Sequence, residues 1–199
     1  MSAAGEAVAT DGTIESRLPT DRWRAIEIAF WAAALAAFFV FPNHRVFGSQ
    51  ILITGLFAVS LDLILGYAGI VSLGHAAFFG VGAYAAGILA VHGWGEPFSG
   101  LVVAGVVGAL AGFATSFLVV RGADLARLMV TLGIGLMLFE AANQMSSITG
   151  GADGLSGVTM GKLFGLYSFD LTGTTAYLYS LGILFLLFVV ARRIVSSPF

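Results

Sequence analysis

The sequence predicts an all-helical, polytopic transmembrane bundle, and two observations predict it: the composition and the length of the apolar runs. Hydrophobic residues make up 58% of the 199 residues and charged residues only 10%, whereas about 25% of an average soluble domain is charged. Apolar runs of roughly 17 to 22 residues follow one another, and each is long enough as a helix to cross a hydrocarbon core of about 30 Å. A transmembrane barrel would instead alternate apolar and polar residues over segments of about ten.

Residues 1–23 are predicted to form a flexible cytoplasmic tail, because charged and small residues alternate there and could not bury enough apolar surface to order alone. A signal peptide is the alternative, since Arg22 and Arg24 precede an apolar run. However, the tail is acidic and the run is long for the core of a signal peptide. Residues 24–199 are expected to form the transmembrane domain.

About six spans are predicted from the apolar lengths and from the breaks between them. The breaks are the turn-forming residues after Phe41, a glycine-rich stretch, the sequence HGWGEP, the sequence RGAD and a long polar loop at 147–172. The predicted spans are 25–41, 47–65, 76–91, 99–120, 127–146 and 173–191.

The basic residues predict the orientation, because cytoplasmic flanks of membrane spans collect Lys and Arg. With the N-terminus inside, the outer flanks hold only Arg45 and Lys162. Both termini are therefore predicted to be cytoplasmic, and the loop at 147–172 is predicted to face outward. The inner flanks then hold Arg17, Arg22, Arg24, Arg121, Arg127, Arg192 and Arg193.

The stretch GYAGIVSLGH, residues 66–75, is the least helical part of the apolar sequence. Gly66, Gly69 and Gly74 stand within ten residues, with Ser72 and His75 beside them. Such a segment can unwind, and non-helical backbone at membrane depth is tolerated where it is buried in protein or lines a watery cavity, as in the substrate sites of transporters. A short inner loop between the second and third spans is the alternative interpretation.

Two ionisable residues near this stretch have structural and functional interpretations. His75 is either hydrogen-bonded in place or part of a substrate path, and no second histidine lies within helical reach to form a metal site. Asp62 must find a partner, reach the interface or take up a proton, because a carboxylate is costly in an apolar span. Glu27, in the first span, is expected at the inner interface.

A polar stripe is predicted at the outer end of the fifth span. Glu140, Asn143, Gln144 and Ser147 are spaced i, i+3, i+4 and i+7, so they share one helix face. The face points into a watery path, or it is simply a solvated helix end. It leads into SSITGGADGLSG, whose glycines predict tight turns in an ordered outer loop.

Small residues recur on one face of the fourth span. In lipid, helices approach closely through such residues, so this face is expected to seat another helix. Its members are Ala104, Gly108, Gly112 and Ser116.

No pattern for chemistry is present, so the chain is not expected to be an enzyme. The run Gly80–Ala85 matches GxGxxA, but it lies inside an apolar span without the preceding soluble strand that dinucleotide binding needs. There is no phosphate-binding loop, no HExxH and no serine elbow, and the carboxylates are too scattered to form an acid/base pair. The sequence has no cysteine, which excludes thiolate metal sites and cysteine nucleophiles.

Two separated stretches carry a resemblance to a known family. LDLILGYAGIVSLGHAAFFGVGAYAAG and RLMVTLGIGLMLFEAANQMSSITGGADGLSGV resemble branched-chain amino acid ABC transporter permeases of the LivM type, and the resemblance covers about residues 46–199. It implies a permease subunit of the bacterial inner membrane that works with a second, LivH-like permease subunit, two ATPase subunits and a periplasmic binding protein. ATP and Mg would be bound by the ATPase partners, and no cofactor is expected on this chain.

The resemblance and the residue patterns together define two groups of candidate site residues. TGGADGL would lie on the face that meets the binding protein; its candidates are Thr149, Gly150, Gly151, Asp153 and Gly154. The GYAGIVSLGH segment would lie near the translocation path in the centre of the bundle. The candidate path residues are Asp62, Gly66, Gly69, Ser72, Gly74, His75, Glu140, Asn143 and Gln144.

Three questions stay open from the sequence. Urea importers have a similar permease subunit, so urea or short amides are an alternative substrate class. The chain ends at Ser197-Pro198-Phe199, where family members begin a cytoplasmic coupling segment, so the sequence is expected to be either the front part of a longer permease or a naturally short chain. The alternative of another class is an ATP-independent channel or a non-functional permease fragment.

Overall fold

The structure, a computed structural model, describes residues 25–67, 69, 71–119, 124–163, 165–170 and 172–195. Within these residues it is helical apart from its connections and one isolated bridge between Leu163 and Tyr167. The predicted tail, residues 1–23, lies outside the described residues. The long helices are α1 (Ala25–Val40), α2 (Arg45–Tyr67), α3 (His75–Val91), α4 (Pro97–Val119), α5 (Asp124–Gln144) and α7 (Thr174–Val195).

All six predicted spans coincide with a long helix, and the largest difference is at the end of α7, at Val195 rather than 191. Among the residues that the structure describes, four helical segments are long and apolar enough to cross a membrane: Pro42–Tyr67, Pro97–Val119, Leu125–Gln144 and Thr174–Val195. The helices α1 and α3 are apolar but shorter, with 16 and 17 residues. The connection at 147–172, which was predicted as a loop facing outward, is more structured than a loop, because α6 (Ser146–Thr149) and the 3-10 helix η3 (Gly151–Asp153) occupy its first part.

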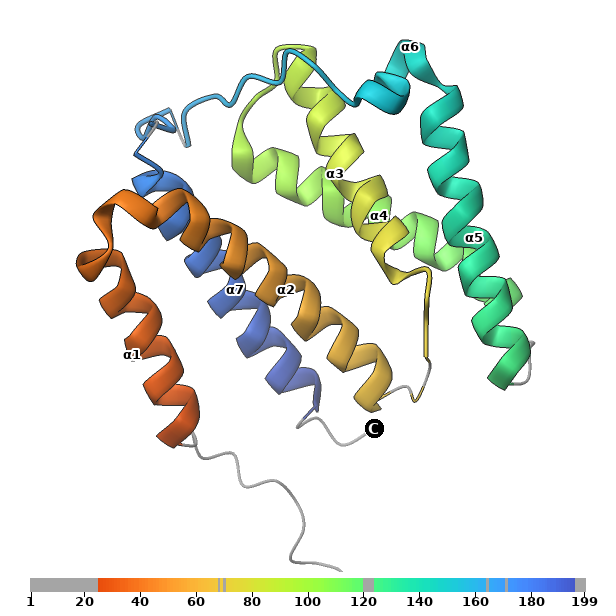
Figure 1. Ribbon diagram of the computed structural model, residues 1–199, viewed down its shortest axis with the longest axis horizontal. Coiled ribbons are helices and arrows are strands. Elements are labelled where there is room, and N and C mark those ends of the chain that lie inside the picture. The colour runs from red at the N-terminus through yellow and green to blue at the C-terminus, as the bar shows by residue number, and fades with distance from the viewer. Residues whose placement is uncertain are drawn as a thin grey trace, which may run out of the picture.

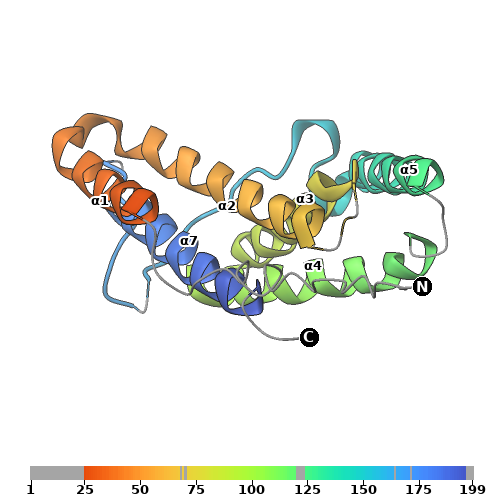
Figure 2. The same ribbon diagram turned by 90° about the horizontal axis from the view of Figure 1, so that it is seen from below.

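The helices form two groups. Figure 1 shows α2 and α7 lying side by side with α1 at their edge, and α3, α4 and α5 together on the other side. Figure 2, from below, shows the same division. The connection from α6 to α7, which includes η3, crosses from one group to the other at one end of the molecule, whereas Ala25 and Val195 lie at the opposite end.

A small apolar core holds the first group together. Leu52 of α2 and Leu181 and Leu184 of α7 are at most 7% exposed. Tyr177 of α7 is equally buried, and its hydroxyl donates a hydrogen bond to the carbonyl oxygen of Ala34 in α1 at 2.7 Å. A buried tyrosine needs such a partner for its hydroxyl, so this one residue joins all three helices.

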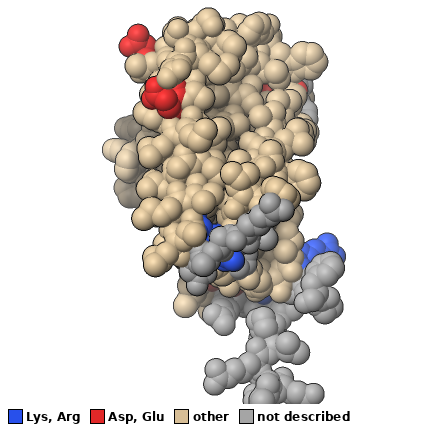
Figure 3. Space-filling model, turned by 90° about the vertical axis from the view of Figure 1, so that its right-hand side faces the viewer, with Lys and Arg blue, Asp and Glu red and all other residues tan. Residues whose placement is uncertain are grey.

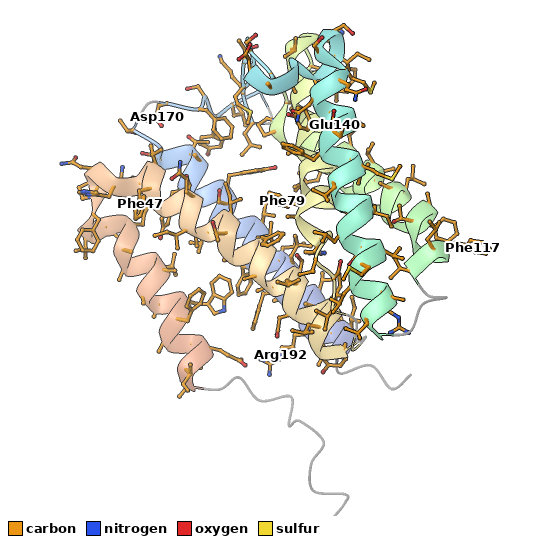
Figure 4. The ribbon with its side chains drawn as sticks, turned by 45° about the vertical axis from the view of Figure 1, so that its right-hand side comes forward. Phe47, Phe79, Phe117, Glu140, Asp170 and Arg192 are labelled. Atoms are coloured by element: carbon orange, nitrogen blue, oxygen red, sulfur yellow. The ribbon has the colours of Figure 1, made fainter. Side chains whose placement is uncertain are left out.

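An ion pair closes the first group at the end where the described chain starts and finishes. Arg192 of α7 and Glu27 of α1 are 2.5 Å apart, and both side chains are mostly shielded from solvent. Figure 4 shows Arg192 at this end of the molecule. Glu27 therefore has a fixed partner on another helix.

Close backbone approach holds α3 against α4. A Cβ atom at Gly82 would lie 3.0 Å from the carbonyl oxygen of Ala104, which leaves room for nothing larger than glycine without a shift. A Cβ atom at Gly108 would lie 3.7 Å from the carbonyl oxygen of Phe78. Small residues that let helix backbones approach are the usual device of helix packing in lipid.

Charged residues lie near the two ends of the molecule. Figure 3 shows a broad uncharged band on this face, with acidic groups at one end and basic groups at the other. Arg45 and Lys162 belong to the end that carries the α6–α7 connection, whereas Arg127, Arg192 and Arg193 belong to the opposite end. An uncharged band between polar ends is what a bilayer requires.

Candidate functional site

The segment between α2 and α3 is non-helical and lies against α5. Gly69 has φ +62°, a left-handed conformation that glycine adopts without strain. The backbone amide of Leu73 donates a hydrogen bond to the hydroxyl of Thr131 in α5 at 3.2 Å. Gly74 is buried, and a Cβ atom there would collide with the carbonyl oxygen of Thr131. Glycine at this position is thus required by the contact with α5.

The contacts that the start of α3 makes with α5 and with α2 both place it well inside the bundle, away from the ends of those helices. Thr131 is the eighth residue of α5, so it lies about 10 Å along the axis from the first residue, Asp124. On the other side, Ser60, which contacts His75, lies seven residues before the end of α2, also about 10 Å. Figure 1 shows the connection rising from the end of α2 alongside α5 to the start of α3. The chain thus re-enters the bundle at residues 71–74 as non-helical backbone before α3 begins at His75.

His75, the first residue of α3, joins the two helix groups. Its Nε2 atom lies 2.8 Å from the Ser60 hydroxyl, which itself lies 2.7 Å from the carbonyl oxygen of Phe57. The serine has one proton to donate and the carbonyl can only accept, so Nε2–H donates to the serine oxygen. The ring also packs on Phe57 at 5.3 Å between centroids, and Phe57 packs on Phe79 at 5.6 Å.

The predicted path residues lie in two separate places. Ser72 is half-buried in the re-entrant segment. Asp62 is exposed near the end of α2, and a Cβ atom at Gly66 would lie 4.0 Å from its Oδ1 atom. Figure 4 shows Glu140 at the opposite end of the molecule. The structure therefore does not bring the polar stripe of α5 to the residues 66–75.

Two side chains of the polar stripe, those of Glu140 and Gln144, are exposed near the end of α5. The amide of Gln144 donates to the Glu140 carboxylate at 2.9 Å, and both side chains are exposed. Asn143 is half-buried, and a Cβ atom at Gly151 would lie 3.2 Å from the backbone carbonyl oxygen of Asn143. The stripe contacts α6 and η3, so it supports the outer loop.

The loop that was predicted to face outward has a defined backbone in its first part. The hydroxyl of Thr149 is buried within hydrogen-bonding distance of the carbonyl oxygens of Ala142 and Met145, at 2.5 and 2.8 Å. It also accepts the backbone amide of Gly151 at 3.3 Å. The glycines Gly150, Gly151 and Gly154 all have positive φ, between +65° and +79°. Asp153 is exposed, so its carboxylate is available on the surface of an ordered turn.

The small-residue face of α4 contacts α3 along its first half. Ala104 and Gly108 lie against α3, as described above. A Cβ atom at Gly112 would meet nothing within 4 Å, and Ser116 is exposed, with its hydroxyl 2.7 Å from the carbonyl oxygen of Phe113. For Gly112 and Ser116, a helix seated on this face stays a prediction.

A cleft that the sequence did not predict lies between the two helix groups. Its volume is about 830 Å³, and α2, α3, α4, α7 and the outer loop line it. Phe79, labelled in Figure 4, is one of its lining residues. None of the predicted path residues lines the cleft, although Ala104 of the packing face does.

A pattern in the sequence could have pointed to the cleft. Gly80, Ala83, Gly87 and Ala90 are spaced i, i+3, i+7 and i+10, so they form one small-residue stripe on α3, and all four line the cleft. A Cβ atom at Gly80 would meet nothing within 4 Å. The same pattern is typical of helix packing, which is why the sequence alone could not distinguish the two.

The described residues contain no group of His, Cys, Asp and Glu side chains that could hold a metal ion. Asp62 lies near the end of α2, at the end of the molecule opposite to Glu140. The arrangement offers a cleft between the helix groups, glycine-rich non-helical backbone inside the bundle, and Glu96 at the edge of the cleft. These are features of a path or a binding cleft.

Comparison with known proteins gives one family and two relatives. The family described as "Branched-chain amino acid transport system / permease component" matches residues 45–199. The chain is 35% identical over 112 residues to the high-affinity branched-chain amino acid transport system permease protein LivM of Salmonella typhimurium, and 34% identical over 112 residues to LivM of Escherichia coli. Each match covers 56% of this chain and 26% of the relative, so the chain matches about a quarter of the length of these curated proteins. No solved structure matches.

Proposed function

Because this chain belongs to the family of branched-chain amino acid transport permeases, we propose that it is a membrane-spanning permease subunit of an ABC importer for branched-chain or related amino acids. The family match over residues 45–199 carries this proposal. The chain is a multi-pass membrane protein, and its relatives are named as transport permeases rather than enzymes. We propose that it works as part of an ABC importer, that branched-chain or related amino acids are its substrates, and that it assembles with the partner subunits described below.

The proposed topology has six spans, both termini in the cytoplasm and the α6–α7 connection outside. Ala25 and Val195 lie at the same end of the molecule, which supports this topology, and Arg192 and Arg193 also lie at that end. In this topology residues 1–23 form a cytoplasmic tail and residues 24–199 the permease domain. The membrane is the bacterial inner membrane.

The proposed translocation path passes the re-entrant segment. Non-helical backbone has unpaired amides and carbonyls, which membrane proteins tolerate where the segment is buried or faces water. Gly74 is buried against α5 and the backbone amide of Leu73 is hydrogen-bonded to Thr131, whereas the side chains of Val71 and Leu73 are exposed and Ser72 is half-buried. Ser72 and the neighbouring backbone groups would therefore face the path, and His75 would hold α3 in position beside it.

The energy for transport is proposed to come from partners. The sequence contains no phosphate-binding loop, so ATP and Mg would be bound by two ATPase subunits on the cytoplasmic side. A second permease subunit would complete the path. A periplasmic binding protein would dock on the outer turn formed by Thr149–Gly154, which has an ordered backbone and an exposed carboxylate at Asp153.

Uptake of labelled leucine into cells that carry the full-length protein with its partners tests the proposal. ATP-dependent uptake that excess valine or isoleucine competes away, and excess urea or acetamide does not, is the expected result. Competition by urea instead would assign the transporter to urea or short amides. ATP-independent leucine flux through reconstituted vesicles would favour a channel and contradict the importer.

A further inference from the structure

We propose that the cleft between the two helix groups binds a zwitterionic α-amino acid with an apolar side chain, with the charged groups held at the outer mouth by Glu96 and Lys162. The inference deepens the proposed function and depends on it, because it names where this chain would hold the transported molecule. It concerns a different place from the re-entrant segment, since none of residues 66–75 lines the cleft.

The interior of the cleft fits an apolar side chain. The walls come from α2 and α7 on one side and from α3 and α4 on the other, and they include Leu52, Leu56 and Ile183. The small residues of α3 form the opposite wall. The volume of about 830 Å³ falls within the range of about 300–1,000 Å³ that is usual for small-molecule sites. Apolar side chains enter such a space through the hydrophobic effect alone.

The mouth of the cleft carries both signs of charge. A second, shallower hollow of about 430 Å³ is lined by residues 92–96 together with Gly161 and Lys162. It shares Trp94, Gly95 and Glu96 with the cleft, so the two spaces adjoin. Glu96 thus stands at the junction of an apolar space and a polar one.

The backbone brings Lys162 close to Glu96. The amide of Gly161 donates a hydrogen bond to the carbonyl oxygen of Gly95 at 2.8 Å. A Cβ atom at Gly161 would lie 3.4 Å from the backbone nitrogen of Glu96. The two charged side chains therefore start from neighbouring points on two different segments.

Neither charge is neutralised by another side chain in the part of the chain that the structure describes. No salt bridge or side-chain hydrogen bond involves the Glu96 carboxylate or the Lys162 ammonium group there. Glu96 is half-buried, and a shielded carboxylate gains from a cationic partner. An α-amino acid supplies one: its ammonium group would meet Glu96, its carboxylate would meet Lys162, and its side chain would lie in the cleft.

The mouth is also held in shape. The hydroxyl of Tyr179 in α7 donates a hydrogen bond to the carbonyl oxygen of Pro97 at 2.9 Å, which connects the first helix group to the start of α4. The indole of Trp94 donates to the hydroxyl of Ser99 at 2.9 Å. These bonds fix the residues on either side of Glu96, so the charges would be presented in a preorganised arrangement.

Photo-crosslinking with photo-leucine, a diazirine analogue of leucine, tests the proposal in membranes that carry the full-length protein and its partners. The expected label lies on the segments that line the cleft, which are residues 49–56, 78–105, 155–160 and 169–183, and excess leucine removes it. Competition by 4-methylpentanoate, which lacks the ammonium group, or by 3-methylbutylamine, which lacks the carboxylate, is expected to be weaker by about tenfold or more, since a hydrogen bond to a charged group contributes about 1.5–3 kcal/mol. Label confined to other segments, or removed better by oleate than by leucine, overturns the proposal.

Two matched variants make the test specific. Gly105→Leu in α4 and Gly182→Leu in α7 alter positions where a Cβ atom meets nothing within 4 Å, but only Gly105 lines the cleft. Gly105→Leu and Glu96→Gln are expected to lower leucine binding by about tenfold or more, and Gly182→Leu to leave it unchanged. If wild-type leucine uptake is intact and neither Gly105→Leu nor Glu96→Gln changes it, the cleft site is wrong while the importer stands. If the wild type takes up no leucine, the proposed function itself fails.

Discussion

Leu73 and Thr131 are joined by a hydrogen bond of 3.2 Å from the backbone amide of Leu73 to the threonine hydroxyl, although 58 residues separate them in the sequence. The bond holds non-helical backbone against α5, about 10 Å from the first residue of that helix. It is the contact on which the re-entrant course of the chain between α2 and α3 depends.

Replacing this hydroxyl is expected to destabilise the protein. Thr131→Val keeps the side-chain shape but removes the acceptor of the part-buried hydrogen bond from the Leu73 amide, which costs about 0.5–1.5 kcal/mol. At this chain length that lowers the melting temperature in detergent by about 2–4 °C per kcal/mol. Thr131→Ser keeps the hydroxyl and is expected to retain most of the stability.

Thr115→Val is the matched control, because the Thr115 hydroxyl contacts only carbonyl oxygens of its own helix, those of Ala111 and Gly112. Equal melting temperatures for Thr131→Val and Thr115→Val would show that the bond to Leu73 does not contribute.

Two glycines of α5 that are two residues apart are expected to respond in opposite ways to alanine. A Cβ atom at Gly135 would lie 3.3 Å from the Cα atom of Gly74, so Gly135→Ala forces the re-entrant segment to shift, at a cost of about 1–3 kcal/mol. A Cβ atom at Gly133 meets nothing within 4 Å, so Gly133→Ala is expected to be neutral or to stabilise by up to about 1 kcal/mol. Thermal unfolding of both variants decides this, and similar losses would argue against close contact at Gly135.

The helices were predictable from the sequence because each apolar run has the length that a membrane span needs. Composition alone distinguishes such runs from their polar connections, so α2, α4, α5 and α7 were found within a few residues. The unwinding near Gly69 and Gly74 was also indicated, since three glycines in ten residues lower helix stability.

The partners of these residues were not predictable. The contact of Gly74 with Thr131 depends on how α5 packs, and no local pattern encodes that. The cleft was missed for a related reason: the stripe from Gly80 to Ala90 fits helix packing as well as a cavity. The outcome depended on where α2 and α7 lie, which only the tertiary structure gives.

The ion pair between Arg192 and Glu27 is expected to contribute a small coupling energy to the packing of α1 against α7. Both side chains are partly exposed, at 20% and 27%, so a coupling energy of about 0.5–1 kcal/mol is expected from a double-mutant cycle of Glu27→Gln and Arg192→Gln. The exchanged variant, Glu27→Arg with Arg192→Glu, should restore part of the loss. Strict additivity of the two single variants would mean that the pair contributes nothing to stability.

The proposed orientation can be tested by labelling single cysteines, since the 199 residues contain none that would give a background signal. Lys162→Cys lies in the α6–α7 connection and Arg193→Cys at the opposite end, beside the described C-terminal end of α7. A membrane-impermeant maleimide applied to spheroplasts is expected to label Lys162→Cys, and to label Arg193→Cys only after lysis. The reverse pattern would invert the topology.

Aqueous access to residue 72 is the most direct test of whether the re-entrant segment faces a substrate path. Ser72→Cys would be treated with a charged, water-soluble thiosulfonate in membranes carrying the assembled importer, with Val106→Cys, an exposed position midway along α4, as the control. Rapid modification of Ser72→Cys that leucine slows, together with an unreactive Val106→Cys, is the predicted result. An unreactive Ser72→Cys from both sides of the membrane, with or without leucine, would contradict it.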